Sequence, residues 1–192
     1  MPRRVRGSAP GGDATPTAVR LRDAAMAEFN AHGFAGTDSN RIARRAGFAP
    51  QTFYRWYKDK TEVFIACYRA WWDEEEASLQ ALFDRDAPSE ALVETGVAHH
   101  RRHLMFRRSL RQLSIDDPAV RRARAEARLR QVTQLRAWAG LGFSDEQLAV
   151  MFFQFERLTD AIAEGELADM GLGETEARRL IAGLVDRVRG RA

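Results

Sequence analysis

The sequence predicts an all-α protein, and three observations support this. Apolar residues recur at the three- and four-residue spacing of helices through most of the chain. No segment alternates apolar and polar residues over a convincing length, so no sheet is expected. The breaks between the periodic segments are rich in Gly, Pro, Ser and Asp. We expect about nine helices, three short ones at the N-terminus followed by a larger helical region.

Composition narrows the class of protein. Of 192 residues, 45% are hydrophobic and 30% charged, which excludes a disordered chain. The single cysteine, Cys67, argues against a disulfide or zinc framework. Without a secretory signal or a long apolar run, we expect a cytoplasmic protein with no membrane association. Residues 1–64 hold eleven Lys and Arg against six Asp and Glu, so this end is basic.

The first helix is expected to follow a flexible arm. Residues 1–14 contain Arg, Gly, Pro and Ser without periodicity and are interpreted as a basic arm. Thr15 is a suitable N-cap, Pro16 suits the first helical position, and Gly33 marks the end. The apolar positions of this helix are Leu21, Ala25 and Phe29.

Two short helices follow. Asp38 is placed to cap the first and Gly47 to end it, while Pro50 opens the second. Two short helices joined by about three turn residues form a helix-turn-helix. The faces expected to be buried consist of Ile42, Ala43 and Ala46 in the first helix and of Phe53 and Tyr57 in the second.

The rest of the chain is expected to be helical. Pro118 after Asp117 and Gln147 three residues after Ser144 are typical helix starts. The sequence therefore divides into an arm, a helix-turn-helix domain and a larger helical domain, at residues 1–14, 15–63 and 64–192. After the helix-turn-helix, helices are expected near residues 60–84, 89–102, 104–114, 118–139, 144–166 and 174–189.

The segment from residue 47 to residue 60 combines five aromatic residues with the only two lysines of the chain. Burial of two aromatic residues leaves Gln51, Thr52, Tyr54 and Arg55 on or beside the exposed face of the second short helix. Gln can pair with an adenine edge, Thr can contact a thymine methyl or a phosphate, and Tyr can donate to a phosphate. Lys58 and Lys60 lie at the next helix start, where backbone N–H groups favour an anion. These residue types indicate binding to double-stranded DNA.

In order and spacing, residues 17–65 resemble the TetR family of bacterial transcription regulators. The elements that carry the resemblance are Gly33-Phe34, Thr37, Ile42-Ala43, Ala46-Gly47, Thr52-Phe53-Tyr54, Trp56-Tyr57, Lys58 and Lys60. Two positions depart from the family pattern. Ser39 replaces an apolar residue, and Asp38 replaces a Ser or Thr that touches phosphate, so we leave Asp38 out of the contacts.

The resemblance implies roles for individual residues. Thr52, Tyr54 and Lys60 would hold phosphates, and Pro50, Gln51 and Trp56 would lie near bases or sugars. The full set of expected DNA contacts is Asn40, Arg41, Pro50, Gln51, Thr52, Tyr54, Arg55, Trp56, Lys58 and Lys60.

By the same resemblance, the larger domain would bind a small effector and dimerise. The last two long helices carry strongly apolar faces, which we interpret as a symmetric four-helix interface of a homodimer. Coverage of the same surface within one chain is the alternative. The residues expected at the interface are Phe152, Phe153, Leu180, Ile181, Leu184, Val185 and Val188.

A pocket for the effector is expected among the middle helices, with apolar walls and a few polar groups. The alternative for most of its candidate residues is ordinary core. His99 and His103 are one helical turn apart but lack a third ligand nearby, so no metal site and no cofactor are expected. The candidate lining residues are Trp71, His99, His103, Phe106, Trp138 and Phe155.

Residues 101–130 contain ten arginines against three acidic residues. They either bind an anionic effector or form a solvated face balanced by the acidic residues 73–76, and we favour the second interpretation.

We expect a ligand-responsive repressor that binds a near-palindromic DNA operator as a homodimer and is released by a small molecule. No Ser/His/Asp order, phosphate loop, dinucleotide fingerprint or metal set supports an enzyme. The remaining alternative is a helical adaptor that binds protein without specific DNA binding. Only a DNA-binding protein would lose affinity steeply as the salt concentration rises.

Overall fold

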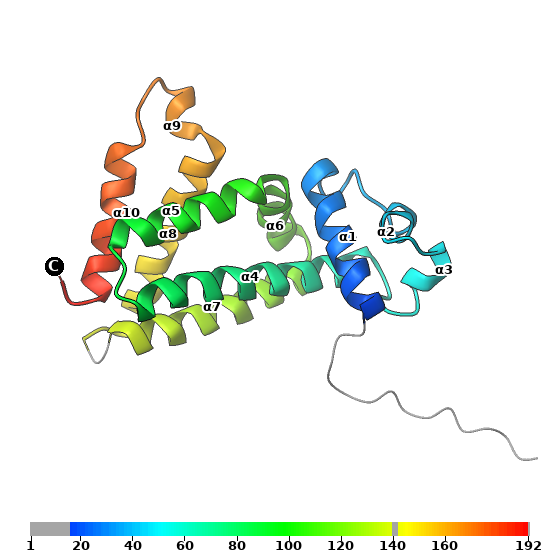
Figure 1. Cartoon of the computed structure of the whole chain (residues 1–192), viewed down its shortest axis with the longest axis horizontal. Helices are drawn as coiled ribbons and strands as arrows, with labels where there is room; N and C mark the ends of the chain where they lie inside the picture. The colour runs from blue at the N-terminus through cyan, green and yellow to red at the C-terminus, as the bar shows by residue number, and fades with distance from the viewer. Residues whose placement is uncertain (1–15, 140–141, 192) are drawn as a thin grey trace, which may run out of the picture.

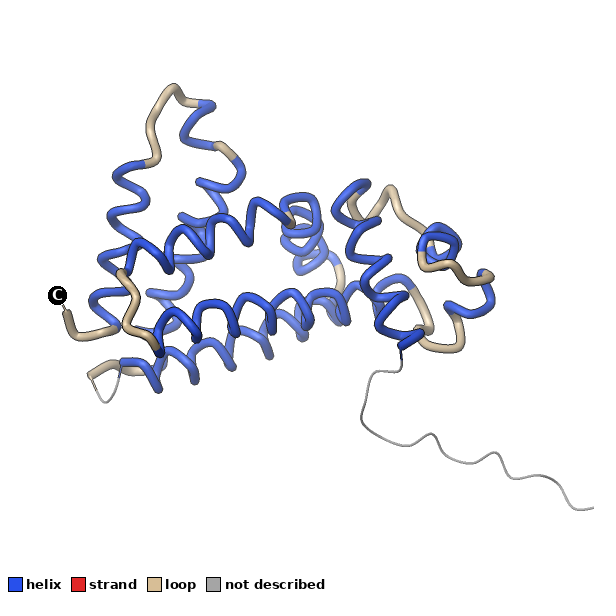
Figure 2. The backbone as a smooth tube through the Cα atoms, viewed as in Figure 1, coloured by secondary structure: helices blue, strands red, loops and turns tan. Residues whose placement is uncertain are grey.

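The computed structural model describes residues 16–139 and 142–191, and these ranges contain ten helices and no strand (Figures 1 and 2). The all-α prediction is confirmed. The helices are α1 (Pro16–His32), α2 (Ser39–Arg45), α3 (Pro50–Phe53), α4 (Lys60–Asp84), α5 (Ser89–Arg102), α6 (Leu104–Asp116), α7 (Pro118–Ala139), α8 (Asp145–Glu164), α9 (Glu166–Asp169) and α10 (Thr175–Val188).

The helix bounds agree closely with the expected ones, with one addition. The helix expected near residues 144–166 ends at Glu164, and the single turn α9 follows. Gly165 separates the two with a left-handed backbone (φ 79°), which a glycine adopts without steric cost. The predicted arm and the Thr15 cap lie outside the described residues.

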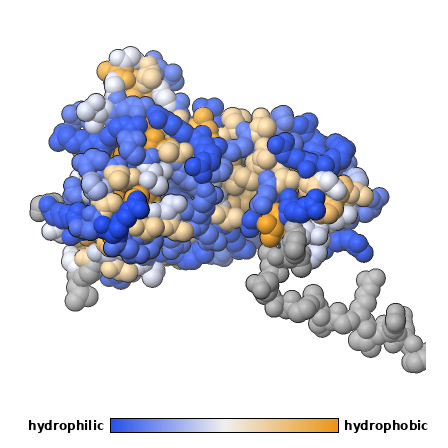
Figure 3. Space-filling model, in the orientation of Figure 1, coloured by the Kyte–Doolittle hydropathy of each residue, from blue (hydrophilic) through white to orange (hydrophobic). Residues whose placement is uncertain are grey.

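The two longest helices, α4 and α7, pack side by side along the length of the molecule (Figure 1). Helices α1 to α3 lie at one end, and α10 lies at the opposite end with the C-terminus. Helices α5, α8 and α10 pack against one another, and α6 packs against α1 and α7. Hydrophilic residues cover most of the face seen in this orientation, and apolar residues form small groups between them (Figure 3).

One apolar core joins the N-terminal helices to the larger region. The ring of Phe64 on α4 contacts that of Phe29 on α1 at 5.1 Å and that of Phe106 on α6 at 4.7 Å, measured between centroids. All three side chains are completely buried. Because α4 runs through the predicted boundary at residues 63 and 64, the two expected domains share a helix and a core.

A second core lies between α5, α8 and α10 and corrects part of the expected interface. Ile181 is completely buried against Val97 and Ile162 within the chain, and Val188 is only 6% exposed. The apolar face of α10 therefore packs mainly inside the protein, as the alternative interpretation allowed. Ile181 and Val188 are not available for a contact between two chains in this structure.

We expect Phe29→Ala to lower the free energy of unfolding by about 3–5 kcal/mol, because it removes the ring that joins α1 to α4 and leaves a cavity. Urea unfolding of the purified protein measures this change. Met170→Ala is the control, since Met170 is 63% exposed and its loss should cost less than about 0.5 kcal/mol. A loss below about 1 kcal/mol for Phe29→Ala would contradict the shared core.

Candidate functional site

The helix-turn-helix is built by local signals that the sequence contains. The Asp38 carboxylate accepts a hydrogen bond from the backbone N–H of Arg41 at 2.8 Å and caps α2. Gly47 after α2 has a left-handed backbone with φ 76°, and Pro50 is the first residue of α3. Arg20 of α1 donates a hydrogen bond to the Ala46 carbonyl at 2.8 Å, which fixes the end of α2 against α1.

Helix α3 is shorter than expected, because it ends at Phe53 and turns follow it. Phe53 is completely buried, whereas Tyr57 lies beyond the helix and is half-buried. The Tyr57 hydroxyl donates to the Ala18 carbonyl at 3.1 Å, and burial raises the pKa of this phenol to about 12. Tyr57 therefore anchors the turn after α3 to the start of α1.

The ten expected contact residues all lie on or beside α2, α3 and the turn before α4. The Tyr54 side chain is 59% exposed and that of Trp56 is 41% exposed. Four of the other residues are exposed, namely Asn40, Gln51, Arg55 and Lys58. The remaining four are half-buried, namely Arg41, Pro50, Thr52 and Lys60. Polar, cationic and aromatic groups thus share one surface at the end of the molecule, and their contact with DNA stays a prediction.

Glu28 on α1 holds two of the arginines of α2. Its buried carboxylate accepts from Arg41 and from Arg45, each at 3.0 Å. Burial would raise the pKa of Glu28, but the two guanidinium groups lower it below its ordinary value. Arg44 lies between them in sequence and is exposed. Arg44 was not among the expected DNA contacts, although it belongs to the same basic run of α2.

Lys60 has a structural role that its sequence position did not reveal. Its ammonium donates to the carbonyls of Phe34 and Thr37, both at 2.7 Å, and lies 4.1 Å from the centre of the Phe34 ring. Burial lowers the pKa of Lys60 below its ordinary value. Since an ammonium has three donors, one remains for a phosphate.

Ser39, which departs from the family pattern, directly contacts Tyr54, one of the expected DNA contacts. The hydroxyl groups of Ser39 and Tyr54 are 2.8 Å apart and share a hydrogen bond. This bond joins the first residue of α2 to the residue that follows α3, so it restrains the direction of the exposed Tyr54 ring.

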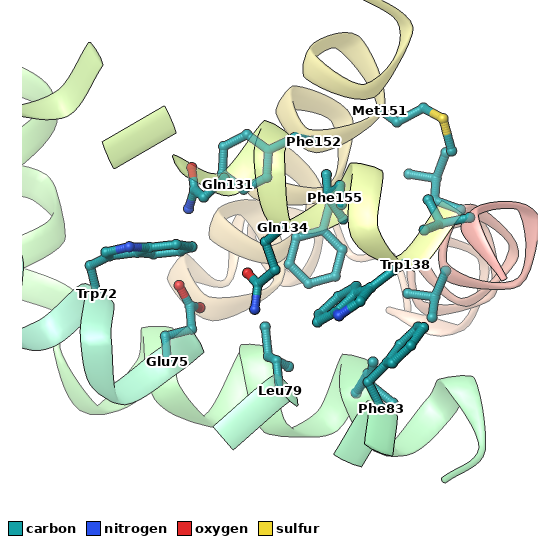
Figure 4. Close-up of a pocket in the computed structure, with 15 residues that line it drawn as sticks. Trp72, Glu75, Leu79, Phe83, Gln131, Gln134, Trp138, Met151, Phe152 and Phe155 are labelled. Carbon is teal, nitrogen blue, oxygen red and sulfur yellow. The ribbon is translucent and has the colours of Figure 1, made fainter. Parts of the chain in front are cut away.

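A cavity lies in the larger region between α4, α7, α8 and α10, with Leu92 contributed by α5. It encloses about 700 Å³ not occupied by protein atoms, including its opening to solvent. Trp138 and Phe155, two of the six expected residues, line it together with Trp72 (Figure 4).

The other four expected pocket residues do not line this cavity. Trp71 stacks on His99 with ring centroids 4.9 Å apart, and His99 bonds to the Trp71 carbonyl at 3.2 Å. His103 bonds back to the His99 carbonyl at 3.1 Å, and Phe106 belongs to the core around α4. Successive residues of a helix point about 100° apart, so Trp72 faces the cavity where Trp71 does not.

The N-terminal part of the chain matches a known family. Residues 21–67 match the family described as bacterial regulatory proteins, tetR family. The helix-turn-helix region of the chain is therefore of the TetR type. This match supports a DNA-binding transcriptional regulator. No curated protein matches the chain.

Solved structures share the TetR fold over most of the chain. A transcriptional regulator from Rhodococcus sp. Rha1 is 16% identical with a TM-score of 0.67, covering 91% of this chain and 96% of its own. The fatty acid degradation regulator FadR from Bacillus halodurans is 16% identical with a TM-score of 0.61. The match covers 91% of this chain and 96% of FadR. The multidrug binding protein EbrR, solved with imidazole, is 19% identical with a TM-score of 0.64, covering 86% and 93%.

Membrane-spanning helices and clustered metal ligands are both absent from the described ranges. None of the helices in residues 16–139 and 142–191 is long and apolar enough to cross a membrane. In the same part of the chain, no three His, Cys, Asp or Glu side chains are grouped so as to hold a metal ion.

Most arginines at residues 101–130 form ion pairs with carboxylates of the described residues. Glu156 of α8 accepts from Arg107, Arg124 and Arg128 at 2.6–3.1 Å. Burial would raise the pKa of Glu156, but these guanidinium groups lower it to about 2. The acidic residues 73–76 contribute less, for example through the 3.0 Å bond from Arg102 to Glu74. This pairing favours a structural role over binding of an anionic effector.

His100 lies buried between two carboxylates. Its Nε2 is 3.0 Å from Glu75 on α4, and its Nδ1 is 2.8 Å from Asp160 on α8. Burial and the nearby Arg107 would lower the pKa of His100, but the two carboxylates raise it above its ordinary value. A protonated His100 donates to both.

The raised pKa of His100 predicts a pH dependence of stability. The folded protein binds this proton more tightly than the unfolded chain, so His100 contributes stability below about pH 6.5 that is lost as pH rises through its folded pKa. We expect the free energy of unfolding of the wild type to fall relative to that of His100→Gln between about pH 6 and about pH 9. Urea unfolding across this range measures the difference, and parallel curves would contradict it.

Proposed function

We propose that the protein is a homodimeric repressor that binds a near-palindromic DNA operator and is released from it by a small molecule. The exposed surface of α2 and α3 carries this proposal, because it gathers hydrogen-bonding, cationic and aromatic side chains on a helix-turn-helix. In such motifs the second helix enters the major groove. Helix α3 and the turn after it are then the part that reads bases.

Exposed apolar residues on α8 and α10 support the homodimer. Phe153 is 45% exposed and Leu180 is 54% exposed, and both belong to the interface expected from the sequence. Val150, also on α8, is 50% exposed. Phe152, Leu184 and Val185 instead line the cavity, so the proposed interface is smaller than expected. A two-fold dimer would place its recognition helices about 34 Å apart, one turn of DNA.

The cavity supports release by a small molecule, since its walls come from helices that also position the DNA-binding domain. Helix α4 begins at Lys60 beside the helix-turn-helix and passes the cavity at Trp72 and Glu75. A ligand that shifts α4 moves the two recognition helices of a dimer relative to each other. For release, the ligand must bind the DNA-incompetent conformation more tightly. FadR, a fatty acid degradation regulator, and EbrR, a multidrug binding protein, have the same fold.

Selection of bound fragments from the source genome with purified protein, followed by a salt titration, tests DNA recognition. We expect an enriched inverted repeat whose binding weakens steeply with salt, because phosphate contacts release counterions. Sequence-independent binding with a shallow salt dependence would contradict the proposal and favour the adaptor. A promoter fused to the selected repeat then distinguishes repression from activation.

Arg55→Ala should weaken operator binding by about tenfold or more, since a lost base or phosphate contact costs about 1–3 kcal/mol. Arg179→Ala is the matched control, because Arg179 is an exposed arginine on α10, far from the helix-turn-helix in sequence. Fluorescence anisotropy with the selected repeat measures both. Equal affinities of the two variants would place Arg55 outside the interface.

A further inference from the structure

One end of the cavity holds buried polar atoms that lack partners. The indole Nε1 of Trp72 and the side-chain oxygen of Gln131 make no hydrogen bond within the part of the chain that is described. Trp72 is only 3% exposed and Gln131 only 5%. A buried polar group without a partner costs about 1–3 kcal/mol, so such groups usually have one. The atoms are one donor and one acceptor.

Glu75 adds a second acceptor at the same end. Figure 4 shows Trp72, Glu75 and Gln131 around one end of the cavity, with the Glu75 carboxylate turned toward it. One carboxylate oxygen is 3.0 Å from His100 Nε2, which leaves the other oxygen as an acceptor for a ligand. Burial would raise the pKa of Glu75, but His100 lowers it, so the pair is charged and balanced.

The opposite end is apolar and aromatic. The rings of Phe83 and Trp138 stack with centroids 4.4 Å apart and planes 8° apart, and Phe155 lies between this pair and the polar end (Figure 4). The Trp138 Nε1 is already satisfied by Gln80 at 3.0 Å. A complementary ligand is therefore apolar along its length and polar at one tip.

We propose that this cavity binds an apolar molecule ending in an uncharged group that both donates and accepts hydrogen bonds, such as a carboxamide. The amide N–H groups would donate to Glu75 and Gln131, and the amide oxygen would accept from Trp72. This assignment rests on the proposed release by a small molecule and names the ligand class.

The charges around the polar end disfavour ligands that end in a carboxylate or in an ammonium. A carboxylate would face the Glu75 carboxylate in a buried site, where like charges repel strongly. An ammonium would add a second cation beside a carboxylate that His100 already balances, and its desolvation would not be compensated. An ammonium also cannot accept from Trp72.

Isothermal titration of the purified full chain with octanamide, octanoate and octylamine tests the proposal, because the three share one tail. We expect octanamide to bind at least about tenfold more tightly than either charged compound, the discrimination that a satisfied buried polar group provides. Equal or tighter binding of octanoate or octylamine overturns the proposal, and so does no binding of octanamide.

Substitutions test whether the preference for octanamide arises at the polar end of the cavity. Gln131→Leu should reduce octanamide affinity about tenfold, since it removes one acceptor. Glu75→Gln should raise octanoate affinity, because the repulsion is lost. Glu74→Gln is the control, as this exposed neighbour on α4 does not line the cavity. If Glu75→Gln does not fold, Gln131→Leu alone decides, and an unchanged octanamide affinity in that variant overturns the proposal.

The proposed function is read out separately by the effect of octanamide on operator binding. Preferred octanamide binding without operator release supports the ligand class and contradicts release by this ligand. Operator release by another molecule, with no preference for octanamide, overturns the ligand class and leaves the regulator intact.

Discussion

The buried guanidinium of Arg107 holds together the helices on which the rest of the molecule depends. It donates to both oxygens of Asp160 at 2.8 and 2.9 Å and to Glu156 at 3.1 Å, and it lies 4.8 Å from the centre of the Trp71 ring. Burial alone would lower the pKa of Arg107, but the carboxylates raise it, so the group stays charged. Removing one partner of such a buried pair leaves an uncompensated charge, a loss of about 3–5 kcal/mol. Helices α4, α6 and α8 are thereby fixed to one another.

The position of α6 in turn determines where the DNA-binding domain lies. The Asn30 side chain of α1 donates to the Arg102 carbonyl at 2.8 Å and accepts from the Phe106 N–H at 3.3 Å. The Phe34 N–H donates to the Ser109 hydroxyl at 3.0 Å. These bonds involve the last residue of α5 and two residues of α6. The helix-turn-helix is therefore held by two supports, the continuous helix α4 and the hydrogen bonds to α6.

Sequence reasoning predicted the helices because their limits depend on local chemistry. Asp38, Pro50 and Ser144 act on their own helix ends, and an apolar period is visible without a partner helix. The assignment of apolar faces was less successful, since a face can be covered within the chain or by a second chain. Ile181 is the clearest case, because nothing in its own helix indicates that α5 and α8 cover it.

Four of the residues expected in the effector pocket do not line the cavity, for a related reason. Trp71 and Trp72 are adjacent and both buried, and only the packing of α7 and α8 decides which one faces an opening. His99 and His103 were noticed as a pair one turn apart, whereas the histidine that bonds to carboxylates on two other helices is His100. Its partners lie on α4 and α8, 25 and 60 residues away in sequence, so no local pattern reveals them.

Glu75 gives the proposed regulation a physical route, because it belongs to both the cavity and the charge network. One of its oxygens bonds to His100, whose other nitrogen bonds to Asp160, which holds Arg107 on α6. A ligand that donates a hydrogen bond to the second oxygen shares the charge of the same carboxylate. It therefore changes the strength of the hydrogen bonds that connect Glu75, His100 and Asp160. Coupling then needs only that the network has a different arrangement in the DNA-incompetent conformation. Since α6 also carries hydrogen bonds to α1, the proposed route from the cavity to the helix-turn-helix would run through α6 as well as along α4.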